Sequence, residues 1–492
     1  MGWLSLSIWT PIVIGALLLL FGKDSQATPV RWLALIGSVI SFLVTLPLYS
    51  GFKLGTAEMQ FVENVPWIER FNVNYHLGVD GLSVWFVLLT AFITIIVVIA
   101  GWEVIQRKVN QYMASFLILS GIMIGVFCAL DGILFYFFFE ATLIPMYLII
   151  GVWGGPNKIY AAFKFFLYTL MGSFFMLVGF IYMYAKSGGS FDIAVWQQLP
   201  LSGTAQTLLF FALFAAFAVK VPMWPVHTWL PDAHVEAPTG GSIVLAAIML
   251  KLGAYGFVRF SMPILPDASR EWAWFMIALS LIAVIYVGLV ALVQKDMKKL
   301  VAYSSVAHMG FVTMGFFIFN DLGISGGLVQ MIAHGFVSGA MFLCIGVLYD
   351  RLHTREISAY GGVINVMPRF GAFALLFFMA NCGLPGTAGF VGEWMVILAS
   401  VRTNFWLGLL LATALISGAG YSLWMFKRVY FGAVGNDNVR TKMPDISWRE
   451  CTALALLAIA VLWMGIFPKP FTDVMDASVA NLVKQVGVSK LN

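Results

Sequence analysis

The sequence predicts an all-α polytopic membrane protein with about fourteen transmembrane helices, and three observations predict this class. Of the 492 residues, 61% are hydrophobic and only 10% are charged, whereas soluble proteins carry about 25% charged residues. The mean hydropathy is +0.91, and the apolar residues form runs of the length that crosses a bilayer, about 20 residues. Two runs are longer and are interrupted by Pro and Gly. Soluble enzymes and nucleic-acid-binding proteins are excluded, because a soluble core does not grow large enough to hide this much apolar surface.

Fourteen apolar runs are assigned in chain order, and each is interpreted as one spanning helix. They cover residues 3–21, 30–50, 80–102, 112–130, 132–153, 162–185, 205–235, 240–260, 271–294, 300–319, 323–349, 368–401, 405–428 and 451–467. Residues 51–79 are the longest polar stretch, and the alternating segment Phe71-Asn-Val-Asn-Tyr within it predicts a small β-hairpin. Residues 468–492 predict a short amphipathic helix.

The seventh and twelfth helices, at 205–235 and 368–401, are predicted to be broken. The seventh contains Lys220-Val-Pro-Met-Trp-Pro-Val-His-Thr-Trp-Leu-Pro, and the twelfth contains Asn381-Cys-Gly-Leu-Pro-Gly-Thr-Ala-Gly. Proline removes a backbone donor and clashes with the preceding turn. At membrane depth, irregular backbone survives only inside protein or beside a hydrated cavity.

The two breaks also predict an internal repeat. Because five spans separate Pro222 from Pro385, helices 4–8 and 9–13 are expected to be equivalent five-helix units, and an odd number of helices inverts the second unit. The predicted regions are helices 1–3 with an external hairpin (1–111), the first unit (112–260), the second unit (271–428), and helix 14 with the tail (429–492).

Basic residues predict the orientation. Most of the 28 Lys and Arg residues lie in loops that follow odd-numbered spans, and such loops stay in the cytoplasm. With an even number of spans, both termini and the hairpin are expected outside the cytoplasm. Arg259 and Lys298 are counted as loop residues, so that only Lys220 and Lys251 remain inside helices.

Ionisable side chains within the predicted spans are the candidates for function, because each costs about 2.5–3.5 kcal/mol to insert into a bilayer. They are Glu140, Lys220, Lys251 and Glu393, with His308 and His334 in spans 10 and 11 and His227 and His234 in the second half of helix 7.

This combination of residue types is that of a proton relay. A carboxylate near a buried lysine favours the protonated lysine, so a movement between Glu140 and Lys220 would change whether Lys220 holds its proton. Histidine titrates near neutrality and passes protons between sites. The structural alternative is that Glu140 and Lys220 form an ion pair between two helices, and that His227 and His234 are hydrogen-bonded bundle histidines.

No cofactor or metal is expected in this chain. The four Cys residues lie far apart, and the sequence has no dinucleotide-binding GxGxxG, Walker loop, HExxH motif or iron–sulfur cysteine set. Its energy must therefore come from an ion gradient or from a partner.

Three motifs identify a family resemblance: Phe-Phe-Phe-Glu140-Ala-Thr-Leu-Ile-Pro-Met-Tyr-Leu-Ile-Ile-Gly-Val-Trp-Gly-Gly, Lys220-Val-Pro-Met-Trp-Pro-Val-His-Thr-Trp-Leu-Pro-Asp-Ala-His-Val-Glu-Ala-Pro and Tyr303-Ser-Ser-Val-Ala-His-Met-Gly. They resemble the antiporter-like, proton-translocating membrane subunits of respiratory complex I over essentially the whole chain. Glu393 on the twelfth helix, where other members carry lysine, and a sequence too short for a long lateral helix resemble the chain M branch of the bacterial NADH-quinone oxidoreductases.

The resemblance implies a role for each candidate residue. Glu140 would modulate Lys220, Lys251 would be the central proton carrier, His308 and His334 would link the half-channels, and Glu393 would lie at the exit.

The resemblance also implies partners and a location. The partners would be other complex I membrane subunits, especially two neighbouring antiporter-like chains, within the lipid bilayer. FMN, iron–sulfur clusters and quinone are expected in partner subunits, so this chain would be coupled only indirectly to NADH and quinone. The location would be the bacterial inner (plasma) membrane, with both termini on the periplasmic side. A subunit of a multisubunit Na+/H+ antiporter, a membrane-bound hydrogenase subunit and a structural membrane scaffold stay open as alternatives.

Overall fold

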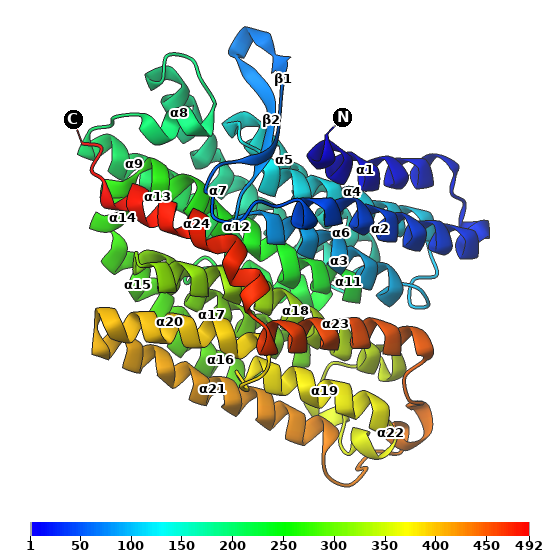
Figure 1. Cartoon of the computed structure of the whole chain (residues 1–492). Helices are drawn as coiled ribbons and strands as arrows, with labels where there is room; N and C mark the ends of the chain where they lie inside the picture. Colours follow the sequence, from blue (N-terminus) through cyan, green and yellow to red (C-terminus); the bar gives the residue numbers. More distant parts are fainter. Residues whose placement is uncertain (1, 492) are drawn as a thin grey trace.

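The computed structural model describes residues 2–491 as a bundle of helices with one two-stranded antiparallel sheet that projects from it (Figure 1). In this range, twelve helices are long and apolar enough to cross a membrane. Large apolar side chains such as Phe21, Val178 and Ile416 are exposed on the outer helices. Apolar residues turned outward on this scale are typical of a protein whose solvent is lipid.

The helical elements follow the predicted runs closely. In the first half they are α1 Trp3–Phe21, α2 Ala27–Ser50, α3 Val84–Ala100, α4 Val109–Cys128, α5 Gly132–Ala141, α6 Leu143–Trp153, α7 Lys158–Lys186, α8 Ile193–Gln198, α9 Gly203–Lys220, α10 Trp229–Glu236, α11 Thr239–Val244, α12 Leu250–Gly256, α13 Met262–Ile264 and α14 Pro266–Glu271. In the second half they are α15 Ala273–Ile282, α16 Gly288–Leu292, α17 Met297–Phe317, α18 Asp321–Leu352, α19 Pro368–Asn381, α20 Ala388–Thr403, α21 Phe405–Tyr430, α22 Asp437–Lys442, α23 Trp448–Ile466 and α24 Lys469–Gly487.

The number of candidate spans differs from the predicted fourteen. The predicted third span is α3, which has only 17 residues. The twelfth is divided into α19 with 14 residues and α20 with 16. All three helices are shorter than the about 20 residues that a straight crossing takes. The division into four regions and the inversion of the two units stay predictions.

The hairpin and the terminal amphipathic helix are both present. Strands β1 (Gln60–Ile68) and β2 (Val73–Val79) pair antiparallel, and Asn72 adopts the left-handed conformation at the turn, as Asn does more readily than most residues. Helix α24 packs against α13, α14 and α18. Its buried residues recur every three or four positions, which is the spacing of one helix face; they are Phe471, Val474, Met475, Ser478, Val479, Leu482 and Val486.

Both predicted breaks are present as well. The seventh helix stops at Lys220 and resumes at Trp229, and the twelfth stops at Asn381 and resumes at Ala388. Between them, residues 239–264 form a continuous helical run (α11 to α13) that is buried from Gly240 onward and contains two π-helical turns, Leu245–Met249 and Phe257–Ser261. Such turns widen a helix locally and are frequent at functional sites.

Close packing of α18 on α20 fixes the second broken helix. A Cβ at Gly392 would lie 2.6 Å from both the backbone N and Cα of Gln330, so we expect Gly392→Ala to push the helices apart at a cost of about 1–3 kcal/mol. The measurement is the amount of folded chain and assembled complex in membranes. Gly435→Ala is the matched control, because nothing lies within 4 Å of a Cβ there. Equal amounts of the two variants would contradict the prediction.

Candidate functional site

The first part of the site lies where α5 meets α6. Pro145 has no N–H for the carbonyl of Ala141, and the helix is interrupted at Thr142. Lys220, which is buried at the end of α9, donates to Thr142 Oγ1 at 3.3 Å. Its Nζ also lies 4.8 Å from the centre of the Phe139 ring, a cation–π distance.

Glu140 and Lys220 do not form a direct ion pair in the described structure. Glu140 is half-buried, and its Oε1 is a buried acceptor without a hydrogen-bond partner. The structural alternative, an ion pair that joins two helices, is therefore not what this arrangement shows. An unpaired buried carboxylate oxygen beside a lysine that is bonded elsewhere leaves room for the two to change partners.

Lys251 lies near the middle of the buried 239–264 run. Its Nζ donates to the carbonyl of Ala246 at 2.5 Å, within the first π-helical turn, and lies 2.6 Å from His334 Nδ1 on α18. The ammonium form of lysine donates to neutral imidazole, whereas neutral lysine accepts from imidazolium. The same short contact therefore accommodates a proton on either side.

His308 and Glu393 form the second part of the site, on α17 and α20. His308 Nδ1 lies 2.7 Å from Glu393 Oε1, and His308 Nε2 lies 3.1 Å from Asn381 Oδ1, whose Nδ2 donates to Ser422. A doubly protonated imidazole donates from both nitrogens and satisfies both acceptors. The twelfth helix is broken at this point, so that Asn381 ends α19 and Glu393 follows on α20.

Lys251 is connected to the second part of the site through the two histidines. The rings of His308 and His334 are 5.7 Å apart between centroids, and His334 Nε2 is buried without a partner. Lys251, His334, His308 and Glu393 thus form a contiguous row across α12, α18, α17 and α20. Lys220, on α9, packs closely against α12, the helix that carries Lys251, since a Cβ at Gly253 would lie 2.8 Å from Lys220 Cβ.

Among the described residues, the two histidines of the seventh helix share no hydrogen bond with this row. His234 is fully buried, both its ring nitrogens lack a partner, and its ring stacks on Phe342 with centroids 4.3 Å apart. His227 is also buried, and its Nδ1 has no partner. The structural alternative of hydrogen-bonded histidines therefore does not account for the two His234 nitrogens.

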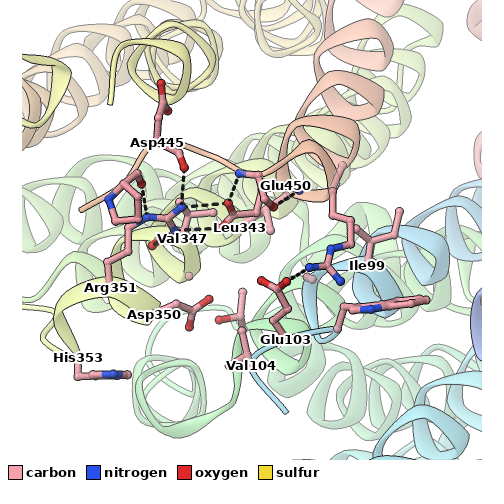
Figure 2. A pocket seen from close by; sticks show the side chains of 18 of the residues that line it. Ile99, Glu103, Val104, Leu343, Val347, Asp350, Arg351, His353, Asp445 and Glu450 are labelled. Carbon is pink, nitrogen blue, oxygen red and sulfur yellow. Dashed lines mark hydrogen bonds and ion pairs between the residues drawn. The ribbon is translucent and has the colours of Figure 1, made fainter. Parts of the chain in front are cut away.

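Two cavities lie at the Thr239 end of the buried run. One of about 610 Å³ is lined by residues of α3, α18 and α23 (Figure 2). The other, of about 190 Å³, is lined by Glu236, Lys298 and Arg355, and the two share Thr239 and Asp350.

Most charges in the larger cavity are paired. Arg351 bonds both oxygens of Glu450 at 2.9 and 3.0 Å, and Arg449 pairs with Glu103. Figure 2 shows the Asp350 carboxylate in the same cavity without a bonded partner among the side chains drawn.

Two residues that the sequence assigned to loops are buried, which corrects that assignment. Arg259 lies in the second π-helical turn and is 3% exposed. Lys298 lies in the first turn of α17, is 5% exposed, and donates to the carbonyl of Ala237 at 2.7 Å. The sequence gives little indication that these two residues are buried, because each is close to a polar stretch. Neutral residues that position the site, such as Asn381, carry no signal in an apolar sequence.

Comparison with known proteins gives a consistent result. The family model described as NADH:quinone oxidoreductase/Mrp antiporter, TM, matches residues 129–417, and the model described as NADH-ubiquinone oxidoreductase chain 4, amino terminus, matches residues 6–129. Subunit M of the NADH-quinone oxidoreductase of Rhodobacter capsulatus is 50% identical over 98% of this chain and 96% of that protein. Chain 4 of the NADH-ubiquinone oxidoreductase of Arabidopsis thaliana is 46% identical over 96% of this chain and 95% of that protein.

A solved structure agrees with these relatives. A chain of respiratory complex I from Thermus thermophilus with bound NADH is 32% identical, superposes with a TM-score of 0.90, and is matched over 99% of this chain and 100% of that chain. The chain therefore belongs to the family formed by subunit M and chain 4 of the NADH-quinone and NADH-ubiquinone oxidoreductases.

Proposed function

We propose that this chain is a proton-translocating membrane-arm subunit of a bacterial NADH-quinone oxidoreductase. The observation that carries the proposal is the contiguous buried row Lys251, His334, His308 and Glu393. A buried row of four ionisable groups is costly in a membrane, and apolar packing would hold the helices together without that cost.

In the proposed mechanism, Glu140 controls the charge on Lys220. When the carboxylate moves away from Lys220, the lysine charge is no longer compensated, and it destabilises a second positive charge on Lys251. Lys251 then gives its proton to His334 across their 2.6 Å contact. From His334 the proton reaches His308 and leaves near Glu393, and a return of Glu140 resets the row.

Protons are proposed to arrive from the cavities that meet at Thr239 and Asp350. Asp350 and Lys298 line the smaller cavity, and His234, which is buried with unpartnered ring nitrogens, is proposed to pass protons from this cavity toward Lys251. His227 is proposed to serve the break itself. A polar cavity of this size holds water molecules that carry protons inward.

The remaining finer assignments are part of the same proposal. The chain would cross the inner membrane fourteen times, counting α3 and the α19–α20 pair as spans, with two inverted units and both termini in the periplasm. Its neighbours would be two antiporter-like chains of the complex. FMN, iron–sulfur clusters and quinone would be bound by other subunits, which makes this chain a non-redox subunit of the enzyme.

The test is to isolate the chain from its native membranes with its partners and to reconstitute the complex into vesicles. We expect NADH-oxidising subunits in the complex and NADH-driven proton movement that an uncoupler abolishes. NADH-independent Na+ uptake, with no NADH-oxidising partner, would instead establish the antiporter alternative. A hydrogen-oxidising partner would establish the hydrogenase alternative.

A further inference from the structure

A third cavity lies at the other end of the buried 239–264 run. Its volume is about 260 Å³, and it is lined by residues of the hairpin, α8 and α24 as well as by Asp80, Arg259 and Pro263. Thr239 lines the two cavities described above, whereas Pro263 lines this one. Lys251 lies about midway between them. A central proton carrier with a cavity at each end of its helix leaks unless one end is closed.

Arg259 and Asp80 lie between this cavity and Lys251. Arg259 follows Lys251 by eight residues, which is about 12 Å along a helix. Its Nη1 and Nη2 bond the two oxygens of Asp80 at 2.9 and 2.5 Å, and its Nε donates to Tyr255 Oη at 2.9 Å. Tyr255 lies one turn from each of Lys251 and Arg259 and donates to the carbonyl of Phe127.

The turn that carries Asp80 is held rigidly. Asp80 Oδ1 also accepts from the backbone N–H of Leu82 at 3.0 Å. Gly81 donates to Ser478 Oγ of α24 at 3.0 Å, and its missing Cβ lets α24 approach the turn closely. The Arg259–Asp80 pair is therefore held in place by contacts from α24 and from the helical run that carries Arg259.

This pair offers no position for a migrating proton. A guanidinium does not release its proton in proteins, and both Asp80 oxygens are occupied by N–H donors. The pair has no net charge, but a hydrated proton that approaches the guanidinium side meets the positive end of the pair, and Asp80 offers it no oxygen that is free of an N–H donor.

Titratable groups are present on the cavity side of the pair. His76 Nδ1 lies 3.2 Å from Asp192 Oδ2 in the same cavity. Burial opposes the charge on Asp192, but the interactions with His76 and the hydrogen bonds from the backbone N–H groups of Ala194 and Val195 together outweigh burial and lower the pKa of Asp192 below its ordinary value. Protons can thus be exchanged at the cavity wall, on the far side of Arg259 from Lys251.

We infer that Arg259 and Asp80 form a proton seal, which closes the hairpin end of the Lys251 helix and leaves His334 as the outlet for the Lys251 proton. This inference rests on the proposed function of Lys251. The experiment measures passive proton conductance without NADH, so that its result does not depend on whether the chain pumps.

The assay uses the whole complex in sealed vesicles, with an imposed pH gradient and a potassium diffusion potential. We expect Arg259→Gln combined with Asp80→Asn, a neutral polar pair, to raise proton conductance at least about tenfold. Arg259→His is expected to leak as well, because histidine titrates and hands protons on. Arg259→Lys keeps a positive charge beside Asp80 and is expected to stay tight.

The matched control is Arg270→Gln combined with Asp267→Asn, which neutralises an ion pair on α14 that lines none of the three cavities. Its proton conductance is expected to equal that of the unmodified complex. Unchanged conductance in an assembled Arg259→Gln, Asp80→Asn complex would overturn the seal. If that complex does not assemble, an Arg259→His complex with unchanged proton conductance would overturn the proposed seal equally. Leakage of Arg259→Lys as great as that of Arg259→His would assign the pair a purely structural role.

Discussion

Replacing Lys220 with Ala is expected to lower NADH-driven proton translocation at least about tenfold, which corresponds to about 1.4 kcal/mol or more on the rate-limiting step. The Lys220 ammonium is buried among aromatic rings and bonds only to Thr142 Oγ1 among the described side chains. Without it, movement of Glu140 no longer changes the charge beside Lys251. We expect NADH oxidation to slow in parallel, because redox chemistry and pumping are coupled in the proposed function.

The measurement is proton uptake into inverted membrane vesicles, with the amount of assembled complex determined on the same vesicles. Lys186→Ala is the matched control, because this lysine is exposed at the end of α7 and is expected to leave translocation unchanged. An assembled Lys220→Ala complex with normal translocation would refute the proposed role of Lys220.

The architecture was predictable because the bilayer makes long apolar runs obligatory. Each predicted run is occupied by helix, and Pro and Gly located both breaks, since a missing N–H acts locally. The number of crossings was less predictable, because the ends of α3 depend on how Asp80 and Gly81 pack against α24. That packing is a contact between residues nearly 400 positions apart and leaves no local pattern.

The site was predictable only where a charge stands in an apolar run. Lys251 and Glu393 were conspicuous for that reason, and the structure brings them into one row with His334 and His308. Arg259 was not conspicuous, because it lies eight residues after Lys251, near the end of the predicted span 240–260. A basic residue in such a position is ordinarily in a loop. The sequence also did not predict that Glu140 and Lys220 are not paired, because Thr142 accepts the hydrogen bond from Lys220 that the Glu140 carboxylate was expected to accept.

The contact between Lys251 and His334 predicts that these two residues act as one unit. Lys251→Met is expected to lower proton translocation at least about fivefold, and His334→Gln to lower it by a similar factor. Because the proton of one is received by the other across 2.6 Å, the double variant is expected to be no worse than the stronger single variant. Residues that act in one step show such non-additivity.

A double-mutant cycle on proton translocation, normalised to assembled complex, measures this coupling. Lys295→Met is the control, since among the described residues this exposed lysine hydrogen-bonds only through its backbone carbonyl, and its effect is expected to be small and to add to that of His334→Gln. If Lys251→Met and His334→Gln instead multiply their losses, the two side chains serve separate steps. The proton would then leave Lys251 by a route other than His334, and the end of its helix opposite the Thr239 cavities is the one that Arg259 and Asp80 occupy. A multiplicative cycle together with an Arg259→Gln, Asp80→Asn complex that leaks no more than the unmodified complex would place the outlet there. A non-additive cycle together with a leaking Arg259→Gln, Asp80→Asn complex leaves the histidine row as the conducting path.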